Sequence, residues 1–212
     1  MNKRVLTNFM DSATLISFAT FALVAAYSPG PNNVMLAASG ANFGFRRTLP
    51  HIFGILFGFC SLVVAAGLGL ATLFVAIPWL YNVLKVMSVL FLLYLAWKIG
   101  SAARATTQAR PKPLSFIQAA SFQLINPKAI TVIISSVTAY TSTAENVGEE
   151  VTILLVVFAT ATICATCTWT VFGTTIAHLL NNKNRLHQFN ITMALLLLAS
   201  LYPSIIAPVL MK

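Results

Sequence analysis

Two clusters of polar and helix-breaking residues interrupt long apolar segments of this sequence, and the second cluster contains a lysine. The first cluster is Ser28-Pro29-Gly30-Pro31-Asn32-Asn33, and the second, about a hundred residues later, is Gln123-Leu124-Ile125-Asn126-Pro127-Lys128. Proline removes a backbone N–H donor and breaks a helix. In hydrocarbon such a break persists only where protein or a water-lined cavity satisfies the freed backbone groups. Paired interruptions in corresponding halves of a membrane chain indicate the binding site of a transporter.

Lys128 is a charged residue near the middle of a predicted membrane span. Asn126 suits the N-cap of a helix and Pro127 its first position, so Lys128 is predicted in the first turn of a new half-helix. The positive end of the helix dipole then coincides with the ammonium group, which favours a bound anion. With the amides of Asn32 and Asn33 at the other break, the pattern predicts a site for a zwitterion that carries a carboxylate. The alternative is a misplaced span, from which Lys128 reaches the interface. The candidate substrate-binding residues are Pro29, Gly30, Pro31, Asn32, Asn33, Gln123, Asn126, Pro127 and Lys128.

Lys128 is also the candidate coupling residue. The acidic residues of the chain all fall at the edges of spans or in loops, so a carboxylate proton relay is not expected. Burial disfavours the charged form of a lysine, and a nearby carboxylate favours it. We therefore expect Lys128 to be protonated with substrate bound and to lose its proton when the site is empty. The acidic residues are Asp11, Glu145, Glu149 and Glu150.

The composition places these residues in a membrane protein. The chain has 212 residues, of which 58% are hydrophobic and 8% are charged, whereas soluble domains carry about 25% charged residues. The net charge of +9 could suggest nucleic acid. The basic residues lie in short loops between apolar spans, where they set membrane orientation instead. The expected surroundings are therefore membrane lipid, and no nucleic-acid partner is expected.

Six apolar segments are long enough to cross the hydrocarbon, which takes about 20 residues. The first and fourth contain the interruptions, and the polar segment 101–113 divides the six three and three. We predict a first three-helix repeat over 1–100, a basic cytoplasmic linker over 101–113 and a second repeat over 114–212. Because three is odd, the second repeat is inverted relative to the first. The predicted fold class is an all-α polytopic membrane protein with six transmembrane helices in two inverted repeats and broken helices 1 and 4. The spans run over about 12–38, 49–77, 79–100, 114–140, 151–180 and 189–209.

Lysine and arginine in the loops predict the orientation, because cytoplasmic loops carry an excess of both. The loops after the second and fourth spans contain neither residue. The other three loops are therefore predicted to be cytoplasmic and both termini periplasmic. Lys3, Arg4 and Lys212 oppose this orientation but are fewer. The basic residues of the three loops are Arg46, Arg47, Lys98, Arg104, Arg110, Lys112, Lys183 and Arg185.

Small and hydroxyl residues indicate close helix packing. Gly54 and Gly58 in the second span are spaced to let another helix approach. The threonines of the fifth span, such as Thr162 and Thr166, either pack against other helices or form a polar wall of a substrate path.

The sequence contains no recognisable metal cluster, nucleotide loop or catalytic triad, so no enzyme activity and no cofactor are expected. His51, His178 and His187 fall at the predicted cytoplasmic ends of spans, where we expect them to be solvated.

The cysteines leave a second function open. Cys60, Cys164 and Cys167 all fall in apolar segments, so no disulfide framework is implied. Cys164 and Cys167 match C-x-x-C, and a membrane thiol or electron carrier could use such buried cysteines. A redox carrier needs its cysteines, whereas a transporter should tolerate serine at all three positions.

Four stretches together resemble a known family. They are Pro29-Gly30-Pro31-Asn32, Gly54-Ile55-Leu56-Phe57-Gly58, Leu93-Tyr94-Leu95-Ala96-Trp97-Lys98 and Phe122-x-x-x-Asn126-Pro127-Lys128-Ala129. They resemble the LysE/RhtB family of amino-acid exporters, and most of all its cysteine/O-acetylserine branch, over nearly the whole chain. The resemblance implies ion-gradient-driven efflux of small neutral or basic amino acids, or their derivatives, across the bacterial inner membrane. Assembly into a homo-oligomer is left open.

Overall fold

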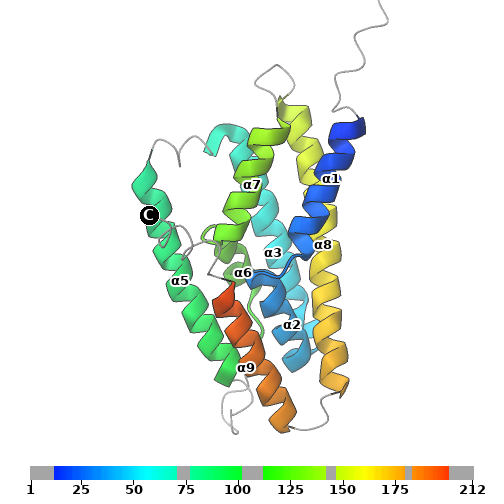
Figure 1. Cartoon of the computed structure of the whole chain (residues 1–212), viewed down its shortest axis with the longest axis vertical. Coiled ribbons are helices and arrows are strands. Elements are labelled where there is room, and N and C mark those ends of the chain that lie inside the picture. The colour runs from blue at the N-terminus through cyan, green and yellow to red at the C-terminus, as the bar shows by residue number, and fades with distance from the viewer. Residues whose placement is uncertain (1–11, 71–76, 102–111, 142–146, 180–182, 201–212) are drawn as a thin grey trace, which may run out of the picture.

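The structure is a computed structural model that describes residues 12–70, 77–101, 112–141, 147–179 and 183–200. Within these ranges the chain is helical and contains no strand (Figure 1). The elements are α1 (Ser12–Tyr27), α2 (Pro31–Phe43), α3 (Phe45–Ala65), the π-helical η1 (Ala66–Leu70), α5 (Pro78–Ser101), α6 (Phe116–Gln123), α7 (Pro127–Tyr140), α8 (Val147–Leu179) and α9 (Lys183–Ala199). The following residues of the sequence analysis lie outside the described ranges: Lys3, Arg4, Asp11, Arg104, Arg110, Glu145 and Lys212.

Several of these helices are long and apolar enough to cross a membrane. Among the described residues, α3, α5 and α8 each contain such a span, and α1 with α2 forms a fourth candidate that bends by 51° at its break. The predicted class of all-α membrane protein is therefore confirmed. The predicted break in the first span is also confirmed.

Some predicted boundaries are wrong because helices continue past the apolar residues. α2 and α3 are separated by Gly44 alone, whose φ is 78°. The basic loop that was predicted around Arg46 and Arg47 is therefore largely helical. α8 begins at Val147 and has Glu149 and Glu150 in its first turn, where the helix dipole favours acids. α9 begins at Lys183, six residues before the predicted start, because a polar sequence can extend a helix beyond the hydrocarbon.

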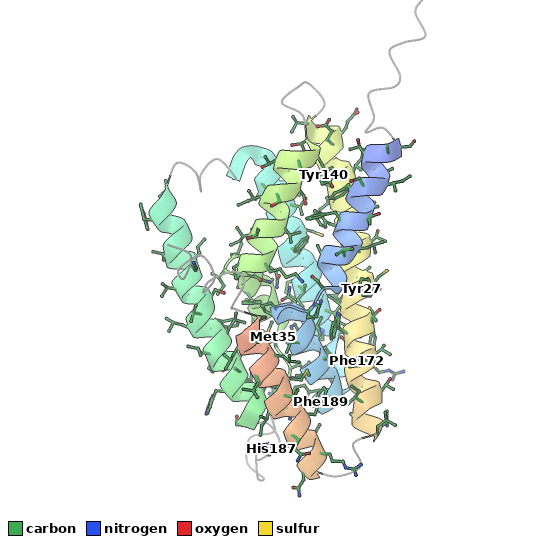
Figure 2. All side chains as sticks on the ribbon, in the orientation of Figure 1. Tyr27, Met35, Tyr140, Phe172, His187 and Phe189 are labelled. Atoms are coloured by element: carbon green, nitrogen blue, oxygen red, sulfur yellow. The ribbon has the colours of Figure 1, made fainter. Side chains whose placement is uncertain are left out.

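The two ends of the bundle differ in charge. α3 and α9 begin and α5 ends at the end that we call the basic end, whereas α8 begins at the opposite, acidic end (Figure 1). α1 and α7 occupy the acidic half, and α2 and α6 the basic half. Tyr140 lies near the acidic end, His187 near the basic end and Tyr27 between them (Figure 2). Among the described residues, the basic end carries Arg46, Arg47, Lys98, Lys112, Lys183 and Arg185.

Glycines hold the basic half together. A Cβ atom on Gly54 would overlap the carbonyl oxygen of Phe116, so this glycine lets α3 contact the backbone of α6. A Cβ atom on Gly173 would likewise overlap the carbonyl oxygen of Ala37, which brings α8 against α2. The close approach predicted at Gly54 is confirmed, and the short helix α6 is held in place by it.

Candidate functional site

The two helix breaks contact each other in the middle of the bundle. Asn32, in the first turn of α2, donates from Nδ2 to Oε1 of Gln123 at 2.8 Å. Gln123, the last residue of α6, donates from Nε2 to Oδ1 of Asn32 at 3.2 Å. Gln123 is fully buried, and its amide also donates to the carbonyl oxygen of Ala119 and accepts from Nδ2 of Asn126. The reciprocal amide pair is therefore part of a buried hydrogen-bond network at the second break. The two breaks, whose residues the sequence analysis assigns to one site, therefore lie in contact in the folded chain.

Side chains also satisfy the backbone groups that the first break frees. The Nδ2 atom of Asn33 donates to the carbonyl oxygens of Ala26 and Ser28 at 2.8 and 2.9 Å, at the end of α1. α2 starts at Pro31, whose missing N–H is not needed at a first helical position. The break is therefore a stable feature of the fold, as an interruption within a membrane must be.

Lys128 connects the second break to the first. The Oδ1 atom of Asn126 accepts from the backbone N–H of Lys128 at 3.2 Å, which makes Asn126 the N-cap of α7, as predicted. The Nζ atom of Lys128 donates to Ser28 twice, to the carbonyl oxygen at 2.7 Å and to Oγ at 2.8 Å. A Cβ atom on Gly30 would lie only 2.8 Å from Cδ of Lys128. Gly30 thus leaves the space through which the lysine side chain passes.

The ammonium group of Lys128 has neutral partners. Within the described ranges, no acidic side chain forms a salt bridge with it, and its acceptors are the two oxygens of Ser28. The positive end of the α7 dipole lies at the same place, because Lys128 is the second residue of that helix. A carboxylate is a stronger acceptor than a carbonyl or a hydroxyl, so the arrangement favours an incoming carboxylate.

A cavity adjoins Lys128, and we call it the central cavity. The centre of a water molecule can reach about 60 Å³ of it. Five of the predicted binding residues line it, namely Gly30, Asn32, Asn33, Asn126 and Lys128, whereas Pro29, Pro31, Gln123 and Pro127 do not. Its other walls are apolar or small residues of α1, α3, α7 and α8, so it extends from the breaks into the acidic half. These are Ala22, Ala25, Ala26, Ile55, Phe59, Ala129, Val132, Phe158, Thr162, Ala165 and Thr166.

Comparison with known proteins identifies the chain. A family model described as LysE type translocator matches residues 23–200, which include both helix breaks. The chain belongs to this family. Two cysteine/O-acetylserine efflux proteins, from Salmonella choleraesuis and Salmonella typhimurium, are each 31% identical to it, over 89% of this chain and 95% of theirs. A protein of the same name from Escherichia coli (strain K12) is 28% identical over similar shares of both chains. No solved structure matches the chain.

The family membership confirms the predicted identity and makes this protein a transporter and not an enzyme. α8 of the translocator both lines the central cavity and packs closely against α2. Thr162 and Thr166 line the central cavity, and the Oγ1 atom of Thr166 donates to the carbonyl oxygen of Thr162 at 2.7 Å. Gly173, further along the same helix, packs against α2.

Ser28 is the functional candidate that the sequence analysis missed. It belongs to the first interruption, but nothing in the sequence paired it with a lysine one hundred residues away. Phe59 and Phe158 were missed as well, since an aromatic residue in an apolar helix carries no sign of facing a cavity.

The histidines and cysteines of the translocator are not among the residues that line the central cavity. His51 is 1% exposed, so its predicted solvation is wrong, because α3 buries it against other helices. His178 is exposed, as expected. The three cysteines, Cys60, Cys164 and Cys167, carry free thiols and do not line the central cavity.

Proposed function

We propose that this translocator exports small neutral amino acids or their derivatives, such as cysteine and O-acetylserine, across the bacterial inner membrane, driven by an ion gradient. The names of the efflux proteins that resemble it support this substrate class. The observation that carries the proposal is the ammonium group of Lys128, which lies beside the central cavity with only neutral acceptors among the described residues.

The geometry supports a specific mode of binding. The substrate carboxylate takes the place of the Ser28 oxygens as the acceptor for Lys128. The small side chain of the substrate then faces the alanines that α1 contributes to the cavity wall, Ala22 and Ala25. Pro29, Gly30, Pro31, Asn32, Asn33, Gln123, Asn126 and Pro127 shape and hold the two breaks around this position.

The helix contacts support six spans in two inverted repeats, over 1–100 and 114–212, joined by the linker 101–113. Such a repeat exchanges α1 with α6, α2 with α7, α3 with α8 and α5 with α9. Under this correspondence, the contact between α3 and α6 is equivalent to the contact between α8 and α1. The contact between α2 and α8 is likewise equivalent to the contact between α7 and α3. All four pairs are in contact, and α5 with α9 forms a pair that maps onto itself.

The differences within these pairs support alternating access. The pairs of the basic half, α2 with α8 and α3 with α6, pack more extensively than their counterparts in the acidic half. The central cavity extends into that looser half. The positive-inside rule makes the basic end cytoplasmic and both termini periplasmic, so this conformation is closed toward the cytoplasm.

Lys128 is the proposed coupling residue. It is protonated with substrate bound and loses its proton when the site is empty, which links proton movement to substrate movement. Arginine keeps its charge near neutral pH and does not provide such a step. Lys128→Arg should therefore keep some substrate binding and lose accumulation against a gradient, and Lys128→Gln should lose both.

The test is export from proteoliposomes, with a panel of labelled amino acids that includes cysteine and O-acetyl-L-serine, and with and without a protonophore. Lys85→Gln is the matched control, because Lys85 lies on α5 and lines neither the central cavity nor a helix break. Transport against a gradient by Lys128→Gln at the wild-type rate would remove Lys128 from both roles. Transport of none of the amino acids by the wild-type protein would refute the proposed function.

A further inference from the structure

A second, partly open cavity lies at the basic end, lined by α2, α3, α5 and the segment that precedes α6. We call it the inner cavity. The centre of a water molecule can reach about 50 Å³ of it. Its polar lining consists of Ser39, Asn42, His51, Lys98 and Lys112, and no acidic residue is among the described residues that line it.

His51 is the unusual member of this lining. Its side chain is 1% exposed, and neither Nδ1 nor Nε2 has a hydrogen-bond partner within the described part of the chain. Buried polar groups are nearly always paired, so an unpaired imidazole at a cavity needs an explanation. A ligand that occupies the cavity would supply the missing partner.

Among the other polar groups of the inner cavity, some already form hydrogen bonds with other residues and some remain for a ligand. The Nδ2 atom of Asn42 donates to Asn190 at 2.7 Å, and its Oδ1 atom accepts from Asn190 at 2.9 Å. Ser39 and Thr48 share a hydrogen bond of 3.0 Å. The imidazole and the two ammonium groups therefore remain for a ligand, and both charges are positive.

We infer that the inner cavity is a loading subsite, where the substrate binds from the basic end before it reaches Lys128. The inference rests on the proposed function. The ligand is a zwitterionic α-amino acid, whose carboxylate binds between Lys98 and Lys112 and whose ammonium or side-chain donor bonds to His51. A substrate with a cationic side chain finds no acidic partner among the described lining residues, so the subsite selects neutral amino acids.

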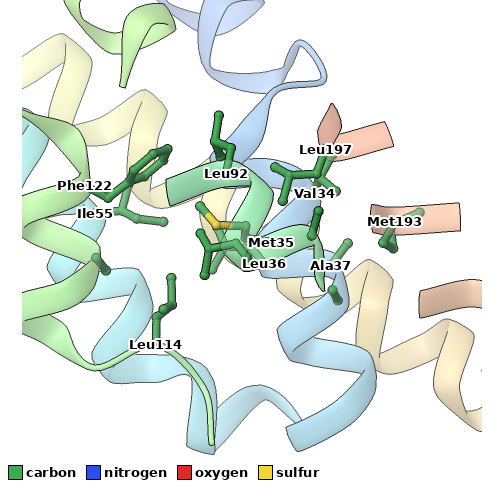
Figure 3. Close-up of a cluster of buried hydrophobic side chains, with 14 of the residues drawn as sticks. Val34, Met35, Leu36, Ala37, Ile55, Leu92, Leu114, Phe122, Met193 and Leu197 are labelled. Carbon is green, nitrogen blue, oxygen red and sulfur yellow. The ribbon is translucent and has the colours of Figure 1, made fainter. Parts of the chain in front are cut away.

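An apolar cluster separates the inner cavity from the central cavity. Met35 and Leu114 line the inner cavity and Ile55 lines the central one. All three belong to the same buried cluster, together with Phe122 (Figure 3). The cluster thus closes the path between the two cavities in this conformation.

α2 forms a wall of both cavities, which gives the substrate a short path. Asn32 lines the central cavity and Ser39 the inner one, and seven residues of α-helix span about 10 Å at 1.5 Å per residue. Rearrangement of the apolar cluster would therefore let a substrate move from one subsite to the other over this short distance, inside the protein.

The inference is tested with purified protein in proteoliposomes of a single orientation, selected by capture of a terminal tag. Exchange of labelled O-acetyl-L-serine gives one KM for substrate added at the basic end and another for substrate added at the acidic end. The variants are Lys98→Gln, Lys112→Gln, His51→Gln and His51→Phe, and Lys85→Gln is the control on the same helix as Lys98.

We expect each lysine substitution to raise the KM at the basic end by about three- to fivefold, as for partly exposed charge pairs, and to leave the KM at the acidic end unchanged. His51→Gln should have a smaller effect than His51→Phe, because glutamine restores a hydrogen-bonding group. If the buried histidine variants do not fold, as judged by gel filtration, the two lysine variants decide the outcome, because Lys112 is exposed and Lys98 half-buried. Lys128→Gln, in contrast, should impair exchange from both ends.

Two results would overturn the loading subsite while the proposed function stands. One is wild-type KM values at the basic end in both lysine variants. The other is an effect that requires phosphatidylglycerol and disappears in liposomes of phosphatidylcholine and phosphatidylethanolamine, since the cavity would then hold an anionic lipid headgroup. Absence of exchange by the wild-type protein would instead overturn the proposed function, and the subsite with it.

Discussion

The substitution Gly30→Ala tests the position of Lys128 by adding a single methyl group. Gly30 has φ of −169° and ψ of 177°, an extended conformation that alanine also adopts, so the backbone is not strained. The new Cβ atom would lie 2.8 Å from Cδ and 3.0 Å from Nζ of Lys128. The lysine side chain is flexible and can move aside, so we expect the protein to fold.

The magnitude follows from these distances. Carbon atoms pack at about 3.5–4.0 Å, so the lysine side chain must move by about 1 Å. Its hydrogen bonds to Ser28, at 2.7 and 2.8 Å, then exceed the ordinary range. A hydrogen bond to a charged group contributes about 1.5–3 kcal/mol. A substrate carboxylate that uses the same ammonium position should lose a similar amount, which lowers kcat/KM by about ten- to a hundredfold.

The assay is export of labelled O-acetyl-L-serine from proteoliposomes, with thermal unfolding measured in parallel. Gly100→Ala is the matched control, because its Cβ atom would meet only the Cβ atom of Ala194, at an ordinary 3.8 Å. Export by Gly30→Ala within twofold of wild type would refute the reasoning, since the position of the ammonium group would then not matter for transport.

Three further changes have definite expected outcomes. Pro31→Ala combined with Pro127→Ala removes the φ restraint at the start of both half-helices; export should fall about tenfold with little change in thermal unfolding, and full export would mean that these prolines are dispensable. Gly173→Ala forces α8 away from α2 and should lower the free energy of unfolding by about 1–3 kcal/mol, whereas Gly148→Ala, with no atom within 4 Å of the new Cβ, should not; equal thermal midpoints for the two variants would contradict this. A phosphatase fused after Lys212 should be active and a fluorescent protein fused there dark, and the reverse pattern would reverse the proposed orientation.

Local chemistry was sufficient to predict both helix breaks. Asn126 and Pro127 are residue types that favour the N-cap and the first position of a helix, and this preference depends only on neighbouring residues. The structure places both residues in these positions. Helix ends were less predictable, because hydropathy reports where hydrocarbon ends and a helix can continue into the polar region. The start of α9 at Lys183, six residues before the predicted start of the sixth span, is one such difference.

Contacts between distant segments were beyond the sequence. In the sequence, Asn32 and Gln123 are simply polar residues at two separate breaks. The two amides form hydrogen bonds only because α2 and α6 come together in the fold. The same holds for His51, whose position near the end of a span suggested solvent although α3 turns it inward. Side-chain direction depends on which helices become neighbours, and hydropathy does not contain that information.

Under the proposed function, the contacts at the breaks would connect substrate binding to movement of the two halves of the chain. Lys128 follows the second break and Ser28 belongs to the first, so their hydrogen bonds join the two proposed repeats. Under the proposed function a substrate carboxylate competes for the same ammonium group and weakens that connection as it binds. A ligand shifts a conformational equilibrium only by its difference in affinity for the two states, and this competition supplies such a difference at the point where the repeats meet. The methyl group in Gly30→Ala would weaken the same connection without providing a carboxylate, which is why we expect that variant to fold and still transport poorly.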